Sequence, residues 1–250
     1  MVITSFLPND SIFSLPPTLL PTDLTLDHYR LILSPEIIPF VQFFINSLLV
    51  SLIVAALSVI VATFGAYSFS RLDYPGHRII SRGVLIVYMF SGILLVVPLF
   101  KVMAWLGLVD SLASVVLAYL VFGLPLSLWL LGSYFNSLPI DIEEASMMDG
   151  YSRVETIFRI TIPLSAPALV AVFLYTFLIA WNEYLFASIF LKTRTNYTLP
   201  IGIEAIYASS VTNTIWGNLM AASVLATIPV LILFFKLESF LTEVSFGSGK

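Results

Sequence analysis

Long stretches of apolar residues without a single charge constrain this chain more than any other feature of its sequence. The longest, residues 40–69, contains thirty consecutive residues without Asp, Glu, Lys or Arg. About 20 helical residues are enough to cross a hydrocarbon layer about 30 Å thick. The whole chain is 59% apolar and 10% charged, whereas soluble domains are about 25% charged. The chain is therefore predicted to be an integral membrane protein.

Four further stretches have the length and apolar character of membrane spans: residues 84–105, 112–134, 168–191 and 219–235. These stretches are continuous, whereas the strands of a transmembrane barrel would be short and alternating. The predicted fold class is all-α, a polytopic membrane helix bundle with five spans. Residues 1–39 contain prolines and no such stretch, and we expect them to form an irregular extracytoplasmic segment ahead of a transmembrane domain over residues 40–250.

The distribution of Lys and Arg among the loops predicts the orientation, because cytoplasmic loops carry an excess of them. If the spans alternate, seven basic residues lie on one side: Arg71, Arg78, Arg82, Arg153, Arg159, Lys236 and Lys250. Four lie on the other: Arg30, Lys101, Lys192 and Arg194. The N-terminus is thus expected outside the cell and the C-terminus in the cytoplasm.

The inventory of reactive residues is small. The chain has no cysteine and only two histidines, His28 and His77, which excludes a thiolate nucleophile and a Cys-based zinc site and argues against a His-rich metal cage. The net charge of −4 offers no basic face for nucleic acid. The sequence therefore contains no candidate catalytic or metal-ligating residue.

Residues 135–167 form a polar loop between two apolar spans, and loops of this length are usually functional or disordered. Here the pattern predicts two short helices with a tight turn between them. Asp141 and Glu144 have the spacing of a capping box at the start of the first helix. Gly150 follows that helix, at the place where a left-handed residue commonly ends one.

The second helix of this loop is predicted to begin at a capping box formed by Ser152 and Glu155 and to end at Pro163. Its apolar residues recur at helical spacing along one face: Val154, Ile157, Phe158 and Thr161. This face must be buried, either against the protein's own membrane domain or against a partner. The pattern alone leaves both possibilities open.

The loop resembles a known motif. Glu144-Ala145-Ser146, Gly150 and Ile160-Thr161-Ile162-Pro163 have the spacing of the EAA loop of inner-membrane permeases from binding-protein-dependent ABC importers, with Ser146 for an alanine and Ile162 for a leucine. Further matches follow in order along residues 4–245: Asn46-Ser47, Ala66-Tyr67 with Arg71, Pro98, Gly107-Leu108, Pro139, Trp181-Asn182-Glu183 and Thr198-Leu199-Pro200. Together they resemble the carbohydrate branch, in particular the second permease of maltose-type systems.

The resemblance implies that the loop docks as a coupling helix into a cytoplasmic ATP-binding subunit. The residues expected at that contact are Glu143, Glu144, Ala145, Met147, Met148, Asp149, Gly150, Arg153, Phe158 and Pro163. The implied partners are a second homologous permease, an ATP-binding subunit dimer, an extracytoplasmic solute-binding protein, a sugar substrate and membrane lipid. Such permeases usually have six spans, so we expect either a start upstream of Met1 or a truncation that removes a first helix.

The chain itself is not expected to hydrolyse ATP. The tail Gly247-Ser248-Gly249-Lys250 has Val at the first glycine position of a P-loop and ends before its Ser or Thr. We therefore expect no cofactor of its own, and ATP bound by the partner subunit.

The second candidate site is Trp181-Asn182-Glu183-Tyr184 in the fourth span. Glu183 lies about four residues, or about 6 Å, from the centre of that span, and a carboxylate there is costly unless it faces a cavity or a partner. It can line a substrate pathway, hold helices together by hydrogen bonds or reach the lipid edge. In the pathway interpretation, Asn182 offers an amide, and Trp181 and Tyr184 could stack on a sugar ring.

Two other functions compete with an importer permease. One is an ion-coupled secondary transporter, a class that commonly has internal repeats and several intramembrane charges, whereas Glu183 stands nearly alone here. The other is a non-transporting membrane scaffold whose loop serves only assembly.

Overall fold

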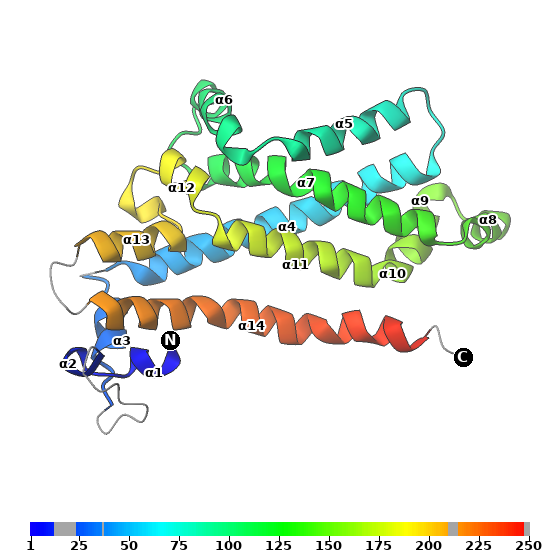
Figure 1. Ribbon diagram of the computed structural model, residues 1–250. Helices are drawn as coiled ribbons and strands as arrows, with labels where there is room; N and C mark the ends of the chain where they lie inside the picture. Colours follow the sequence, from blue (N-terminus) through cyan, green and yellow to red (C-terminus); the bar gives the residue numbers. More distant parts are fainter. Residues whose placement is uncertain (13–23, 37, 210–214, 248–250) are drawn as a thin grey trace.

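The structure, a computed structural model, describes residues 1–12, 24–36, 38–209 and 215–247, and every regular element in these ranges is a helix (Figure 1). The prediction of an all-α fold is confirmed. Three long helices form the centre of the bundle and pack along one another: α4 (Phe40–Arg71), α7 (Leu112–Ser137) and α11 (Ala166–Asn182). Small buried residues such as Ala55, Ala62 and Ala66 let α4 approach its neighbours closely.

The remaining helices surround this centre. On one face lie α5 (His77–Met89) and α6 (Gly92–Trp105), and on the other lies α14 (Ile215–Gly247), as Figure 1 shows. At one end of the bundle are α12 (Leu185–Phe190), the 3-10 turn η2 (Arg194–Asn196) and α13 (Leu199–Ser209). At the opposite end are α8 (Ile140–Met148), α9 (Arg153–Thr156), the π-helix η1 (Ile157–Thr161) and α10 (Ile162–Leu164).

The number of continuous spans differs from the prediction. By length and composition, the described residues contain three helices able to cross a membrane, Phe40–Arg71, Leu112–Ser137 and Trp216–Glu238, and a fourth if the bent pair Arg153–Leu164 and Ala166–Asn182 counts as one span. The predicted span 84–105 is divided between α5 and α6, because the chain leaves the helix at Phe90 and Ser91. The predicted span 168–191 is divided between α11 and α12.

The N-terminal segment is more regular than expected. It contains α1 (Val2–Ser5), α2 (Asn9–Ile12) and α3 (Asp27–Ile32), all in contact with α14. His28 is buried there, with Nδ1 3.0 Å from Asn218 Oδ1 and Nε2 3.0 Å from the Leu7 carbonyl oxygen. A side chain at Gly217 would clash with the His28 ring, so glycine allows this contact.

Candidate functional site

The loop between α7 and α11 is attached to the membrane domain by a buried ion pair. Glu143 of α8 accepts a hydrogen bond from Arg71 Nε at 3.0 Å and another from the Tyr67 hydroxyl at 2.9 Å. Arg71 also donates to the Leu138 carbonyl at 2.9 Å. The side chains of Arg71 and Glu143 are only 7% and 8% exposed. Glu143 was predicted to contact an ATP-binding subunit, but its carboxylate faces α4 and anchors α8.

The turn after α8 has the predicted geometry. Gly150 has φ +93°, and its N–H donates to the Met147 carbonyl at 3.1 Å. The next residue, Tyr151, donates to the Ser146 carbonyl at 3.2 Å, which completes a Schellman motif. A residue with a Cβ atom at position 150 would raise the conformational energy of the backbone by about 1–2 kcal/mol in this left-handed conformation.

The start of α8 differs from the prediction. Its N-cap position is Pro139, no side chain caps it, and Asp141 lies inside the first turn. The predicted capping box of Asp141 and Glu144 is therefore wrong. The helix begins two residues earlier in sequence than the cap pattern indicated, directly after Pro139.

The capping box of the second helix is confirmed. Ser152 Oγ accepts the Glu155 N–H at 3.3 Å, and the Glu155 carboxylate accepts the Ser152 N–H at 2.8 Å. Pro163 does not end the helix, which continues to Leu164 before the chain bends by 76°. Pro163 is the second residue of α10, which follows the π-helix η1 directly.

The apolar stripe of the second helix is divided into two rows. Ile157 and Thr161 are buried, and Ile157 packs in a cluster with α4, α7 and α11. Val154 and Phe158 are 61% and 55% exposed. Burial against the protein's own membrane domain therefore holds for Ile157 and Thr161, whereas docking of Val154 and Phe158 against a partner stays a prediction.

The other residues predicted for docking lie on the surface of this loop. Exposed there are Glu144, Ala145, Met147, Met148, Asp149, Gly150, Arg153, Phe158 and Pro163. Met148, a large apolar side chain, is 88% exposed. Ser146 is instead buried, and its hydroxyl lies 2.6 Å from that of Thr156. This contact ties α8 to α9, so the two parts of the loop form one unit.

At the opposite end, Glu183 lies in a break between helices rather than inside a span. Its carboxylate accepts the N–H groups of Phe186 at 2.9 Å and Ala187 at 3.3 Å, and so caps α12. Of the alternatives open in the sequence, the structure assigns Glu183 a hydrogen-bonding role, toward backbone rather than another side chain. Tyr119 strengthens this junction by donating to the Glu183 carbonyl at 3.4 Å.

The neighbours of Glu183 differ in how accessible they are. Trp181 is 4% exposed and stacks on Phe177, with ring centroids 5.6 Å apart. Its ring face is therefore already occupied. Asn182 and Tyr184 are exposed, and the Asn182 amide donates to the Leu178 carbonyl at 2.8 Å.

Trp181, Asn182 and Tyr184 line one open pocket of about 510 Å³, together with residues of α13 and α14. Glu204 and Tyr207 of α13 also line it, and Glu204 is hydrogen-bonded to Tyr184. Sequence reasoning missed both residues because α13 lies outside the predicted spans. A carboxylate in an apolar helix is costly, and this argument, which singled out Glu183, would also have singled out Glu204. Tyr207 lies on the same helix.

No group of three or more His, Asp or Glu suited to a metal ion occurs among the described residues. What these residues do form is a helical membrane bundle with a broken helix beside a pocket at one end and an exposed, anchored two-helix loop at the other. That arrangement is typical of a helical membrane permease.

Comparison with known proteins identifies the family. Residues 37–242 match the binding-protein-dependent transport system inner membrane component, and the chain belongs to this family. It is 46% identical over 241 residues to the inner membrane ABC transporter permease protein YcjP of Escherichia coli, which covers 96% of this chain and 85% of that protein. It is 36% identical over 243 residues to the trehalose/maltose transport system permease protein MalG of Thermococcus litoralis, covering 97% and 86%.

The fold agrees with a solved structure. A chain of a bacterial ABC transporter involved in the import of the acidic polysaccharide alginate superposes with a TM-score of 0.81 at 22% identity, covering 95% of this chain and 87% of that one. At this identity the likeness establishes the fold alone. The protein is thus a multi-pass permease of the binding-protein-dependent family.

Proposed function

We propose that this chain is one permease subunit of an ATP-driven importer for sugars or related solutes, and that it forms half of the translocation pathway. The names of its relatives support the substrate class, since they include trehalose/maltose and trehalose transport permeases. A second homologous permease would supply the other half, and an extracytoplasmic solute-binding protein would deliver the sugar.

The loop of residues 138–165 is the proposed contact with the ATP-binding subunit, and one observation carries this assignment: it exposes Met148, Val154 and Phe158 although the rest of it is anchored. An apolar patch with charges at its edge is typical of a protein interface, and Glu144, Asp149 and Arg153 are exposed on the same loop. ATP would be held by the partner, and this chain needs no cofactor.

The anchor explains how movement would reach the membrane. Glu143 joins α8 to Arg71 at the end of α4, and Ile157 joins the second helix to the core. Packed elements with two discrete arrangements transmit displacements as rigid bodies. A loop pulled by closing ATP-binding subunits would therefore tilt α4 instead of deforming alone. In this assignment the loop and the C-terminus lie in the cytoplasm.

The pocket beside Glu183 is the proposed outer part of the pathway. Asn182, Tyr184 and Glu204 offer amide, hydroxyl and carboxylate groups, which suit the hydroxyls of a sugar. Glu183 contributes indirectly by keeping α11 and α12 apart, and Trp181 forms part of the pocket wall.

The first test is the variant Glu144→Lys with Gly150→Pro in the assembled complex. Proline cannot adopt the positive φ of residue 150, and lysine reverses a charge at the interface, so we expect sugar-stimulated ATP hydrolysis to be abolished while membrane insertion stays intact. Gly107→Pro is the matched control, because Gly107 also has a positive φ, +68°, and lies outside this loop.

Affinity purification from native membranes accompanies this test. Recovery of an ATP-binding subunit with wild type and its loss with the double variant supports the assignment. Unchanged stimulated ATP hydrolysis in the double variant would contradict docking through this loop.

A further inference from the structure

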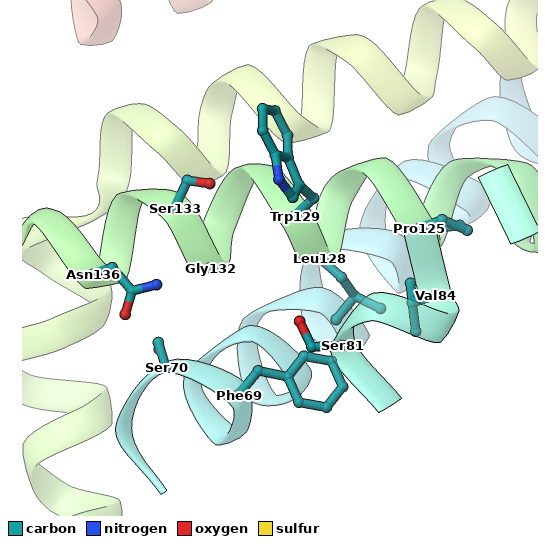
Figure 2. Close-up of a pocket in the computed structure, with 10 residues that line it drawn as sticks. All are labelled: Phe69, Ser70, Ser81, Val84, Pro125, Leu128, Trp129, Gly132, Ser133 and Asn136. Atoms are coloured by element: carbon teal, nitrogen blue, oxygen red, sulfur yellow. The ribbon is translucent and has the colours of Figure 1, made fainter. Parts of the chain in front are cut away.

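A second pocket, distinct from the one beside Glu183, lies between α4, α5 and α7 (Figure 2). Its volume is about 250 Å³. Ser70 is the penultimate residue of α4 and Asn136 the penultimate residue of α7, so the pocket lies toward the end of the bundle that carries the coupling loop. Pockets for whole drug-sized molecules are about 300–1,000 Å³. This one therefore suits a smaller group, such as a single sugar ring.

The pocket collects hydrogen-bonding groups that the protein does not use. Within the described residues, the side chains of Ser81, Trp129, Ser133 and Asn136 have no hydrogen-bond partner. Ser70 donates to the Ala66 carbonyl at 2.8 Å, which leaves its oxygen free to accept. In Figure 2 the Asn136 side chain points from α7 toward the end of α4 that carries Ser70.

The chemistry of these groups indicates the ligand. None of the described lining residues is charged. Hydroxyls and an amide pair with several ligand hydroxyl groups, and Trp129, which is half-exposed, offers an aromatic surface for an apolar face. A neutral molecule with hydroxyls around an apolar ring face meets all three conditions.

We propose that this pocket binds one ring of the transported sugar near the cytoplasmic end of the pathway, as a release subsite separate from the outer pocket. The inference rests on the proposed function, because it needs a sugar to arrive there. It assigns ligand contacts to Ser81, Trp129, Ser133 and Asn136, none of which belongs to residues 138–165 or to the pocket beside Glu183.

Gly132 allows the pocket to be filled without disturbing the fold. It lines the pocket, and a Cβ built on it meets no atom within 4 Å, so the side chain of Gly132→Leu enters empty space. Gly83 of α5 is also helical and open but does not line the pocket, which makes Gly83→Leu the matched control.

In proteoliposomes that contain the complete importer, with maltose and trehalose as probes, we expect Gly132→Leu to lower uptake at low sugar concentration about tenfold. This corresponds to losing one or two hydrogen bonds to the ligand. Gly83→Leu should change uptake less than about twofold, within the range of a neutral surface substitution.

Occupancy can be measured directly because the chain contains no cysteine. Ser133→Cys places one thiol in the pocket, and Ser137→Cys places one on an exposed position of the same helix outside it. A sugar at ten times its dissociation constant should slow labelling of Ser133→Cys about elevenfold, since only the empty fraction reacts. Labelling of Ser137→Cys should not change. If Ser133→Cys fails to assemble, Ser81→Cys takes its place.

The possible outcomes separate this inference from the proposed function. Suppose sugar stimulates ATP hydrolysis but does not protect Ser133→Cys from labelling, or protects Ser133→Cys and Ser137→Cys equally. Either result overturns the release subsite and leaves the proposed importer function intact. Protection by lipid alone, without sugar, assigns the pocket to a lipid headgroup and also overturns it. If neither sugar stimulates ATP hydrolysis or enters the vesicles, the proposed sugar import fails, and the subsite fails with it.

Discussion

At the scale of single residues, Glu143 shows how one side chain can belong to a functional motif and still serve the protein's interior. It lies beside Glu144 in the chain, yet Glu143 is buried against Arg71 and Glu144 is exposed. The sequence could not show which of the two carboxylates is buried. Arg71 is 72 positions away from Glu143, and only folding brings these two residues together. Gly150 was predictable because a helix C-terminus is a local arrangement.

This difference predicts unequal effects of two neighbouring substitutions. Glu143→Ala leaves the Arg71 guanidinium buried without its partner, and breaking such a pair costs about 3–5 kcal/mol. Glu144→Ala removes an exposed charge and should change stability by less than about 0.5 kcal/mol. Thermal unfolding of the purified complex in detergent measures both. Equal midpoints for the two variants would show that the ion pair does not hold the loop.

At the scale of secondary structure elements, the long apolar helices were predictable from the sequence, whereas their breaks and the short helices α1 to α3 and α13 were not. Hydropathy averages over many residues, so it joined α5 to α6 and α11 to α12 across gaps of two residues. The second gap is maintained by the Glu183 carboxylate, which binds the N–H groups of α12. Such a cap was not recognised because Glu183 stands inside an apolar run. The Ser152 cap was recognised because it starts a polar helix.

Another carboxylate connects elements at the same end of the bundle. Asp110, between α6 and α7, has φ +61° and accepts the N–H groups of Lys192 at 2.8 Å and Thr193 at 2.9 Å. It also accepts bonds from the Thr193 hydroxyl and the Asn196 amide. The hydrogen bonds from Thr193 and Lys192 hold the pKa of Asp110 well below its usual range. Asp110 thus fastens the segment between α12 and α13.

This clamp predicts a pH dependence of stability. Because the folded-state pKa of Asp110 is depressed, its stabilising effect is complete above the unfolded pKa of about 4 and is lost as the pH falls through the folded value. Asp110→Asn removes the effect, so the difference in thermal midpoint between wild type and this variant should be largest above pH 5 and should shrink toward pH 3. A difference that is constant from pH 6 to pH 3 would rule out the clamp.

At the scale of the whole molecule, the bundle has two different ends. One carries α8 to α10 and the C-terminal part of α14, and the other carries α1 to α3, α6, α12 and α13 (Figure 1). Arg71 and Arg153 lie at the first end, as the alternation of spans predicted. The cytoplasmic location of that end remains a prediction from the excess of Lys and Arg.

Single cysteines test this orientation in intact cells, again without a native cysteine to remove. A membrane-impermeant thiol reagent should label Leu24→Cys, an exposed position before α3, from outside the cell. It should reach Met148→Cys only after the cells are permeabilised. The reverse pattern would invert the assigned topology.

The separation between the anchor and the exposed face of the coupling loop has a consequence for exchange between related transporters. Glu143, Ser146 and Thr156 hold the loop in place from within, while the side chains of Glu144, Met148 and Asp149 are exposed on its surface. Under the proposed docking, substitutions at these exposed positions would change which ATP-binding subunit the permease accepts, while the buried contacts that hold the loop, and the helices of the membrane domain, stay the same.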